Sequence, residues 1–416
     1  MEADIVIIGG GIAGLWTLDE LRRNGVRALL LENRTLGFGQ TISSQGIIHG
    51  GLKYSLKGVL TASADEIREM PLVWRECLSG QREPNLSKTN VRSHCCYLWQ
   101  TRALSSQAGM LGAQLNLRIK PKNISDHQRP EILRETPGHV YRLDEQVLSP
   151  SSLLNSFRNR LSPYLLQIDE SEGVQLHVEK SGVVSAVTIR HDSREETISC
   201  RAIMMSAGVS NTLLSEQAGR KQPMQLRPLH MTMVKGALPM FQGHCIDGAK
   251  TRMTITSEYL GDGQTVWQLG GNIAEQGTGQ TSEDLIRFAA RELSEILPAV
   301  DTSDLEFATY KIDRAERKVK LGMRPDTPQI LKHKNVLTCW PTKLAFAPRV
   351  AERIQQMIQK EFGIEKHSEE WSLDELSEWK TPEVAAAPWS NVEGWYDAQG
   401  QKLSVPNDVN PLKQAG

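Results

Sequence analysis

The sequence predicts an α/β fold that combines a Rossmann-type domain, built on a parallel sheet, with a domain built on an antiparallel sheet. The chain has 416 residues, which is too many for one small core, so we expect two domains. It opens with an apolar strand, a glycine turn, a helix and a second apolar strand, an order typical of a parallel sheet. From Val174 onward, short segments of alternating apolar residues are separated by turns, which is typical of antiparallel strands.

The individual elements are predicted from hydrophobic period and from start and stop signals. Pro150 marks the start of one helix, and residues 81–139 are mixed in pattern and rich in turn residues. Expected strands are 5–8, 27–31, 174–178, 183–190, 202–205, 231–235, 252–256, 266–269 and 336–339. Expected helices are 12–24, 61–78, 151–160, 283–297 and 347–362.

The overall composition excludes several classes of function. The formal net charge is −1, so no global field favours nucleic acid, and we expect no nucleic-acid partner. None of the six cysteines forms a CxxC pair, so we expect reduced thiols, with neither disulfides nor a metal site. The acidic start lacks the features of a secretory signal, and no apolar run is long enough to span a membrane. We therefore expect a cytoplasmic protein, with peripheral membrane contact left open.

The first turn carries a dinucleotide-binding fingerprint. The run 9–14, Gly-Gly-Gly-Ile-Ala-Gly, matches GxGxxG, follows a strand directly and opens a helix. Gly9 permits the tight turn, Gly11 lets a pyrophosphate approach the backbone, and Gly14 lets the helix pack on the strand. Together with Ala13, these residues form the start of a helix whose N–H groups favour phosphate. The pattern therefore predicts a site for an adenine dinucleotide.

An acidic residue completes this fingerprint. Glu32 stands 18 residues after Gly14, at the end of the second strand, where a carboxylate can accept hydrogen bonds from ribose hydroxyls. It would repel a 2′-phosphate, which argues against NADP, and we count the adjacent Asn33 with the same site. The fingerprint alone does not separate FAD from NAD. Its position at the start of a long, strand-rich chain favours a flavoprotein, which wraps its cofactor more than once.

A second segment carries a family resemblance. Residues 39–54, Gly-Gln-Thr-Ile-Ser-Ser-Gln-Gly-Ile-Ile-His-Gly-Gly-Leu-Lys-Tyr, resemble the second flavin segment of the D-amino-acid oxidase superfamily. The likeness is nearest to the glycerol-3-phosphate dehydrogenase/oxidase and L-2-hydroxyglutarate dehydrogenase branch. It extends over roughly residues 3–362, because further stretches resemble the motifs of that superfamily in the same order. These stretches are 206–211, 227–230, 321–328 and 343–348.

The resemblance implies FAD as cofactor and interleaved domains. An FAD domain would comprise 1–80, 141–225 and 320–365, a substrate domain 81–140 and 226–319, and 366–416 would form a C-terminal extension. That extension carries four tryptophans and is expected to pack along the surface. The implied cofactor contacts, beyond those of the fingerprint, are Thr41, Ser44, Gln45, Gly46, Ala207, Gly208, Lys343 and Leu344.

The resemblance also implies two catalytic residues. His49 would be the base that removes a hydroxyl proton as hydride leaves for the flavin, a role that suits an imidazole. Arg324 would grip a substrate carboxylate or phosphate with its planar fork. The alternatives are a histidine that only hydrogen-bonds the flavin and an arginine in a structural ion pair. The expected activity is hydride transfer from a small anionic substrate, a 2-hydroxy acid or polyol phosphate, to FAD.

Two departures and two rival functions remain. The run 227–230 lacks the usual arginine and glycine, and 339–342, Cys-Trp-Pro-Thr, replaces a glycine-rich turn, which puts access of oxygen in doubt. The electron acceptor is therefore left open among oxygen, a quinone and a carrier protein. An amine or amino-acid oxidase is the nearest rival function. From a different class, the chain would be a flavin-bearing subunit whose tail docks on a partner. A homo-oligomer is compatible with every one of these alternatives.

Overall fold

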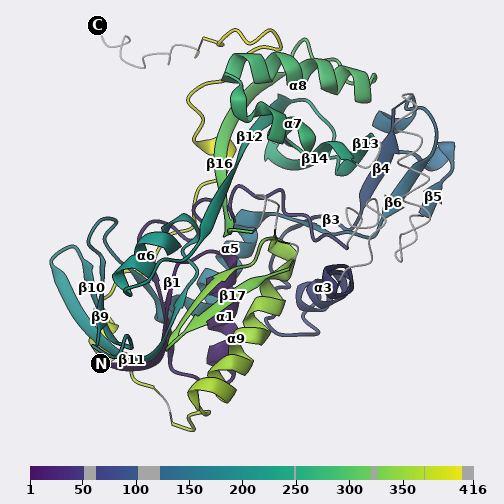
Figure 1. The fold of residues 1–416 in the computed structure, drawn as a ribbon. Helices are drawn as coiled ribbons and strands as arrows, with labels where there is room; N and C mark the ends of the chain where they lie inside the picture. The colour runs from purple at the N-terminus through teal and green to yellow at the C-terminus, as the bar shows by residue number, and fades with distance from the viewer. Residues whose placement is uncertain are drawn as a thin grey trace, which may run out of the picture.

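The computed structural model describes residues 1–50, 62–101, 122–247, 250–319, 325, 327–369 and 371–404. Within these residues the chain forms two eight-stranded sheets and a two-stranded ribbon. In the view of Figure 1 the first sheet lies in the lower half of the molecule and the second in the upper half. In this described part of the chain, no helix has the length and apolar character needed to cross a membrane.

The first sheet is the predicted parallel one. Its order is β17-β18-β11-β1-β2-β8, and β18, β11, β1, β2 and β8 run parallel, with β17 antiparallel at the edge. The strands are near-continuous apolar runs because both faces are covered. Ile5 and Ile7 face one core cluster, whereas Val6 and Ile8 face another. The strands are β1 (Glu2–Ile8), β2 (Ala28–Glu32), β8 (Leu165–Gln167), β11 (Arg194–Met205), β17 (Gln329–His333) and β18 (Val336–Trp340).

Helices cover one face of this sheet and a hairpin covers the other. The helices are α1 (Ile12–Arg23), α5 (Pro150–Leu161) and α9 (Ala347–Phe362), which share one apolar cluster with Trp74 of α3 (Ala62–Leu78). α9 ends where Gly363 adopts a φ of 58°, a conformation that favours glycine. The hairpin β9 (Val174–Val178) and β10 (Val184–His191) pairs with the long strand β11.

The second sheet is antiparallel except where β13 pairs with β4, and its order is β16-β12-β15-β14-β13-β4-β6-β5. The amphipathic helix α8 (Ser282–Ile296) packs on its outer face and is capped by the Thr281 hydroxyl, which accepts the Asp284 N–H. The strands are β4 (Cys96–Gln100), β5 (Lys122–Ile124), β6 (Val140–Leu143), β12 (Met224–Gly236), β13 (Gly243–Asp247), β14 (Lys250–Gly261), β15 (Gln264–Gly270) and β16 (Glu306–Arg317). Two short helices, α6 (Asn211–Gln217) and α7 (Asn272–Gln276), follow β11 and β15.

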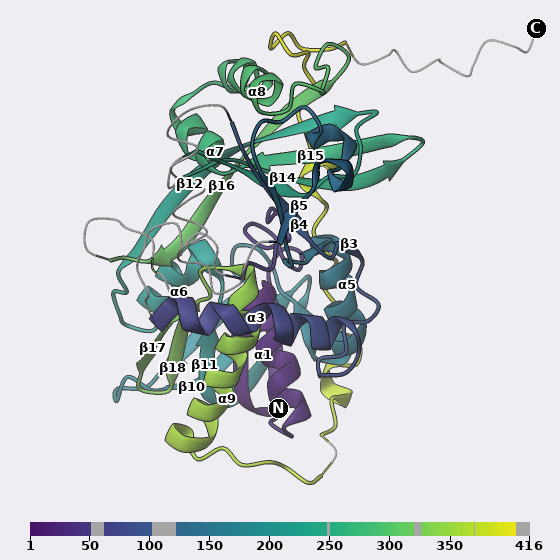
Figure 2. The same cartoon turned by 90° about the vertical axis from the view of Figure 1, so that its right-hand side faces the viewer.

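Two connections tie the sheets together. The ribbon of β3 (Val91–Ser93) and β7 (Val147–Leu148) lies between them. The segment after α9 runs from the first sheet to the second (Figure 2). Trp379 packs against the apolar cluster of Val6 and Ile8 in the first sheet, and Trp395 packs against the cluster of Met233, Val266 and Ala308 in the second. The assignment of residue ranges to domains stays a prediction.

Candidate functional site

The carboxyl ends of the parallel strands form one edge of the first sheet. β1 lies between β2 and β11, so the chain order reverses at β1, and a crevice at such a switch point is the usual ligand site in open α/β sheets. Glu32 is the last residue of β2, and the Gly9 turn, the Ser206 turn and Pro341 follow directly after β1, β11 and β18. The structure therefore brings the fingerprint and two later motifs to the same edge.

The glycines of the fingerprint have the geometry that their assigned roles require. Gly9 has a φ of 111°, and a Cβ there would lie 2.7 Å from the backbone of Ala207. A Cβ on Gly14 would lie 2.1 Å from the Gly9 carbonyl oxygen. By contrast, the nearest atom to a Cβ on Gly11 is Thr41 Oγ1, at 3.5 Å. Two of the three glycines are thus required by the protein's own packing, whereas Gly11 leaves room on its Cβ side.

The start of α1 is joined to the second flavin segment. The Ile12 N–H donates to Thr41 Oγ1 over 3.1 Å, so Thr41 lies against the glycine turn. The Thr41 hydroxyl thus accepts a hydrogen bond from one of the N–H groups of the first helical turn, which the fingerprint predicts as donors to phosphate. Thr41 lies beside the glycine turn, and its hydroxyl oxygen is a partner of the helix start.

Glu32 is buried at the end of β2, with 8% of its surface exposed. Its Oε2 accepts the Gly10 N–H over 2.7 Å, and its Oε1 accepts the Arg34 N–H over 2.9 Å. Burial raises the pKa of this carboxyl, although the same N–H bonds oppose the rise. Each oxygen retains acceptor capacity, which ribose hydroxyls could use. The Asn33 side chain instead donates to the carbonyl of Glu170 over 3.1 Å.

A buried asparagine that the sequence did not single out as a site residue braces the turn after β11. The Ala207 N–H donates to Asn211 Oδ1 over 2.9 Å, and Asn211 Nδ2 donates to the Cys339 carbonyl over 3.3 Å. Asn211 has no exposed surface, and Gly208 adopts a φ of 55°. The ends of β11 and β18 are thereby held in register. Its only sequence signal was its place at the end of the 206–211 motif.

The expected contacts after β18 lie next to this turn. Lys343 precedes a short turn that begins at Leu344 and leads into α9, and its Nζ lies 5.1 Å from the ring centroid of Phe346. Thr342 has a φ of 63°, and Trp340 is 1% exposed. Within the run 339–342, Cys339, Trp340 and Thr342 are buried and Pro341 is half-buried.

The second flavin segment is attached to the second sheet. Gln45 Nε2 donates to the carbonyls of Thr254 and Gln268 over 3.1 and 3.0 Å. The amide nitrogen of Gln45 is thus engaged with protein, and any contact with a cofactor would come from its other atoms. Gly46 has a φ of 70°, and a Cβ there would lie 2.0 Å from the Leu148 carbonyl oxygen.

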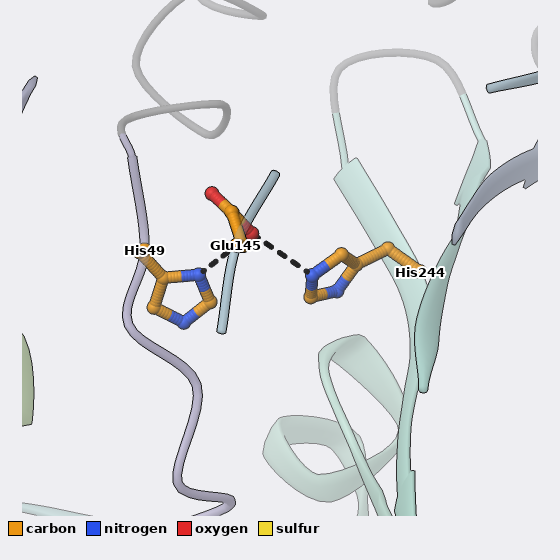
Figure 3. A group of neighbouring side chains, drawn as sticks. All are labelled: His49, Glu145 and His244. Carbon is orange, nitrogen blue, oxygen red and sulfur yellow. Dashed lines mark ion pairs between the residues drawn. The ribbon is translucent and has the colours of Figure 1, made fainter. Parts of the chain in front are cut away.

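Three side chains from distant parts of the chain converge near His49, which belongs to this segment (Figure 3). Glu145, between β6 and β7, places its Oε2 3.7 Å from His49 Nδ1 and 3.6 Å from His244 Nε2 of β13. The side chains of His49, Glu145 and His244 are 29%, 4% and 1% exposed. Glu145 Oε1 accepts the Gly50 N–H over 2.7 Å. His244 Nδ1 lies 2.9 Å from Thr254 Oγ1.

Two opposing effects act on the pKa of the buried carboxylate in this group. Burial alone would raise the pKa of Glu145, but the interactions with His244 and His49 outweigh burial and hold its pKa far below the usual range. The ligand atoms of the three residues lie within 4.8 Å of one another, so the set could also hold a metal ion. Neither Glu145 nor His244 was predicted from the sequence, because no local pattern links either residue to His49. Arg324, the expected anion-binding residue, lies outside the described residues.

Known proteins resemble this chain in sequence as well as in fold. A model of the family described as FAD dependent oxidoreductase matches residues 4–340. The probable FAD-dependent oxidoreductase PA4991 of Pseudomonas aeruginosa is 37% identical over 395 residues, which cover 94% of this chain and 98% of that protein. The crystal structure of PA4991 matches with a TM-score of 0.79 at 34% identity, and the match covers 94% of this chain and 98% of that chain.

Two further solved structures share the fold at low sequence identity. Glycine oxidase from Geobacillus kaustophilus matches with a TM-score of 0.64 at 12% identity, covering 88% of this chain and 100% of that chain. L-α-glycerophosphate oxidase from Mycoplasma pneumoniae, with FAD bound, matches with a TM-score of 0.61 at 14% identity, covering 89% and 97%. The predicted α/β class with a Rossmann-type sheet is confirmed.

The carboxyl edge of the first sheet fits FAD. Gly11 offers backbone that a pyrophosphate can approach, and Glu32 offers buried acceptor capacity for a ribose. Ser44 Oγ is buried and has no hydrogen-bond partner within the described residues, which is uncommon for a buried hydroxyl. The matched family uses FAD, and a structural neighbour has FAD bound. The donors and acceptors at this edge of the sheet suit that cofactor.

Proposed function

Because this chain belongs to the family of FAD-dependent oxidoreductases, we propose that it oxidises a small anionic substrate at a carbon that bears a hydroxyl group. The substrate class is a 2-hydroxy acid or a polyol phosphate. FAD, when bound, accepts the hydride that leaves this carbon. The observation that carries the proposal is His49, an imidazole set against a buried carboxylate at the end of the second flavin segment.

The cofactor would be held along the carboxyl edge of the first sheet. Gly9, Gly11, Ala13 and Gly14 would face the pyrophosphate, and Glu32 would accept hydrogen bonds from the adenosine ribose. Ser44, Gly46 and the turn at Ala207 and Gly208 would lie nearer the flavin. Lys343 would place positive charge near the flavin pyrimidine, where it stabilises the reduced cofactor.

The chemistry that the chain itself supplies is proton removal. Loss of hydride from a carbinol carbon leaves a carbonyl only if the hydroxyl proton is also removed, which is the task of a general base. His49 Nδ1 faces Glu145, so we assign proton transfer to Nε2. Arg324 is proposed, from the family resemblance, to bind the carboxylate or phosphate of the substrate. An amine substrate would need no such base, because a neutral amine can release hydride directly.

Anaerobic bleaching of the FAD-loaded protein tests this function. We expect glycerol 3-phosphate or a 2-hydroxy acid such as 2-hydroxyglutarate or lactate to bleach the flavin, and glycine, sarcosine and proline to leave it oxidised. His49→Asn should slow flavin reduction by about 10²- to 10⁴-fold, the usual contribution of general acid–base catalysis. The control is His177→Asn, a histidine of β9 in the first sheet. Bleaching by amines alone, at the same rate in His49→Asn, would show that the chain is an amine oxidase.

A further inference from the structure

Glu145 contacts a second histidine in addition to the proposed base His49. Glu145 is buried and lies between two imidazoles, one from the second flavin segment and one from β13 (Figure 3). Both ends of the arrangement are anchored. The Gly50 N–H fixes one carboxylate oxygen, and Thr254 Oγ1 fixes the far nitrogen of His244.

We propose that Glu145 is a positioning residue that orients His49, and that His244 carries the proton that balances the buried carboxylate. This rests on the proposed role of His49 as base. A protonated imidazole donates from both nitrogens, and the two nitrogens of His244 face a carboxylate oxygen and a hydroxyl oxygen, both of which can accept. His49 is then a neutral imidazole that turns Nδ1–H toward Glu145 and presents Nε2 to the substrate, the tautomer that a base needs.

Charge balance is the reason for a second histidine. A carboxylate that is only 4% exposed needs a counter-charge, because an unpaired buried charge is very costly. If His49 supplied this charge, it would be protonated and could not act as a base. His244, at 1% exposure, can supply it without touching the substrate. The pair Glu145–His244 is then close to neutral, and His49 keeps a lone pair at Nε2.

One further titratable group beside Glu145 is the Cys96 thiol of β4. Burial raises the pKa of this thiol well above the usual range, which favours its neutral form. A metal ion would need one point near 2 Å from all three ligand atoms. The carboxylate oxygen lies between the two nitrogens, with one ring on each side, at 3.7 Å from His49 and 3.6 Å from His244. These separations are those of ion pairs and are longer than hydrogen bonds. Ligands of one metal ion could have the same spacing, so metal content distinguishes the two arrangements.

We call the arrangement in which Glu145 orients His49 and His244 balances the charge of Glu145 the relay. NMR of the full-length, FAD-loaded protein with labelled histidine rings tests the relay without any substrate. The His49 ring signal is identified by its loss in His49→Asn. In Glu145→Gln the titration midpoint of His49 should fall by about 1–3 pH units, because an adjacent negative charge is lost. In His244→Asn it should rise by a similar amount, because Glu145 then has only His49 as its counter-charge.

Control variants separate this relay from a general structural effect. His230→Asn removes another histidine of the second sheet that is also 1% exposed, and it should leave the His49 midpoint unchanged. Glu145→Asp keeps the charge and should restore most of the wild-type midpoint. Flavin content and circular dichroism establish that each variant is folded. In the flavin-reduction assay, Glu145→Gln should slow reduction on the order of 10- to 100-fold, as loss of an orienting partner usually does.

The outcomes are distinct. Midpoints that do not move, or that move in the same direction in Glu145→Gln and His244→Asn, would overturn the relay. Metal analysis can also overturn the relay. If the wild type retains one equivalent of metal that a chelator removes, and if His49→Asn, Glu145→Gln and His244→Asn lack it, the three residues form a metal site. Opposite midpoint shifts without bleaching by any hydroxyl substrate would leave the relay standing and refute the proposed function alone.

Discussion

Gly14→Ala tests whether the fingerprint works through close packing. An added Cβ would lie 2.1 Å from the Gly9 carbonyl oxygen, 2.9 Å from Ser206 Oγ and 3.2 Å from Leu30 Cδ1. All three contacts are shorter than van der Waals contact, two of them by the larger margin, and Ser206 Oγ also donates to Gly9 O over 3.0 Å. Overpacking of this kind costs about 1–3 kcal/mol, against a gain of at most about 1 kcal/mol in helix propensity.

Relief of the clash must move α1 away from β1, which shifts the helix start that faces the pyrophosphate. We therefore expect Gly14→Ala to lower the thermal midpoint and to weaken FAD binding by about tenfold or more, since about 1.4 kcal/mol is tenfold in affinity. FAD affinity is measured by fluorescence titration of the FAD-free protein. Gly279→Ala is the matched control, because no atom lies within 4 Å of its added Cβ. Wild-type affinity and thermal midpoint in Gly14→Ala would refute the packing argument.

Two further predictions concern the adenosine site and the C-terminal segment. Glu32→Gln should weaken FAD binding by about 10- to 100-fold, because a charged acceptor contributes about 1.5–3 kcal/mol, and the same titration measures it. Burial raises the Glu32 pKa, so this group stabilises the FAD-free fold most below its unfolded pKa of about 4.3 and less as the pH rises through its folded pKa; Glu32→Gln should remove that dependence. Trp395→Ala should cost about 2 kcal/mol, roughly half the loss for a fully buried tryptophan, because Trp395 is partly exposed where it covers Met233, Val266 and Ala308. Denaturant unfolding measures it, and an unchanged midpoint would mean that the segment does not stabilise the second sheet.

Elements with a strong local period were predictable from sequence. The helix expected at 347–362 has those bounds in the structure, and the strand expected at 174–178 is β9. β16 was missed because it lies at an edge of the second sheet, where charged residues alternate with apolar ones and weaken the signal. The parallel pairing of β13 with β4 is set by long-range packing that no local pattern records.

The same distinction applies to the site. The glycine turn and Glu32 are close in sequence and belong to one strand–helix–strand unit, so their meeting at one edge could be predicted. Glu145 and His244 lie far from His49 in sequence. The order β13-β4-β6 of the second sheet brings them together, and the bridge between Ile47 and Val147 places them next to the segment of His49. A glutamate in a short connection and a histidine in a strand have no pattern that marks them as functional. Their role became visible only through burial and distance.

The segment that carries His49, the proposed base, is held largely by the second sheet. Ser43 accepts a hydrogen bond from the Tyr310 hydroxyl of β16 over 3.1 Å, and Gln45 donates to the backbone of β14 and β15. Gln40 Oε1 accepts the Ala315 N–H over 3.1 Å. The segment that leads to His49 is therefore held by strands that contribute nothing to the glycine turn. We therefore expect FAD affinity to depend on the first sheet and the proposed placement of His49 against the flavin to depend on the second, so that the two properties can change independently.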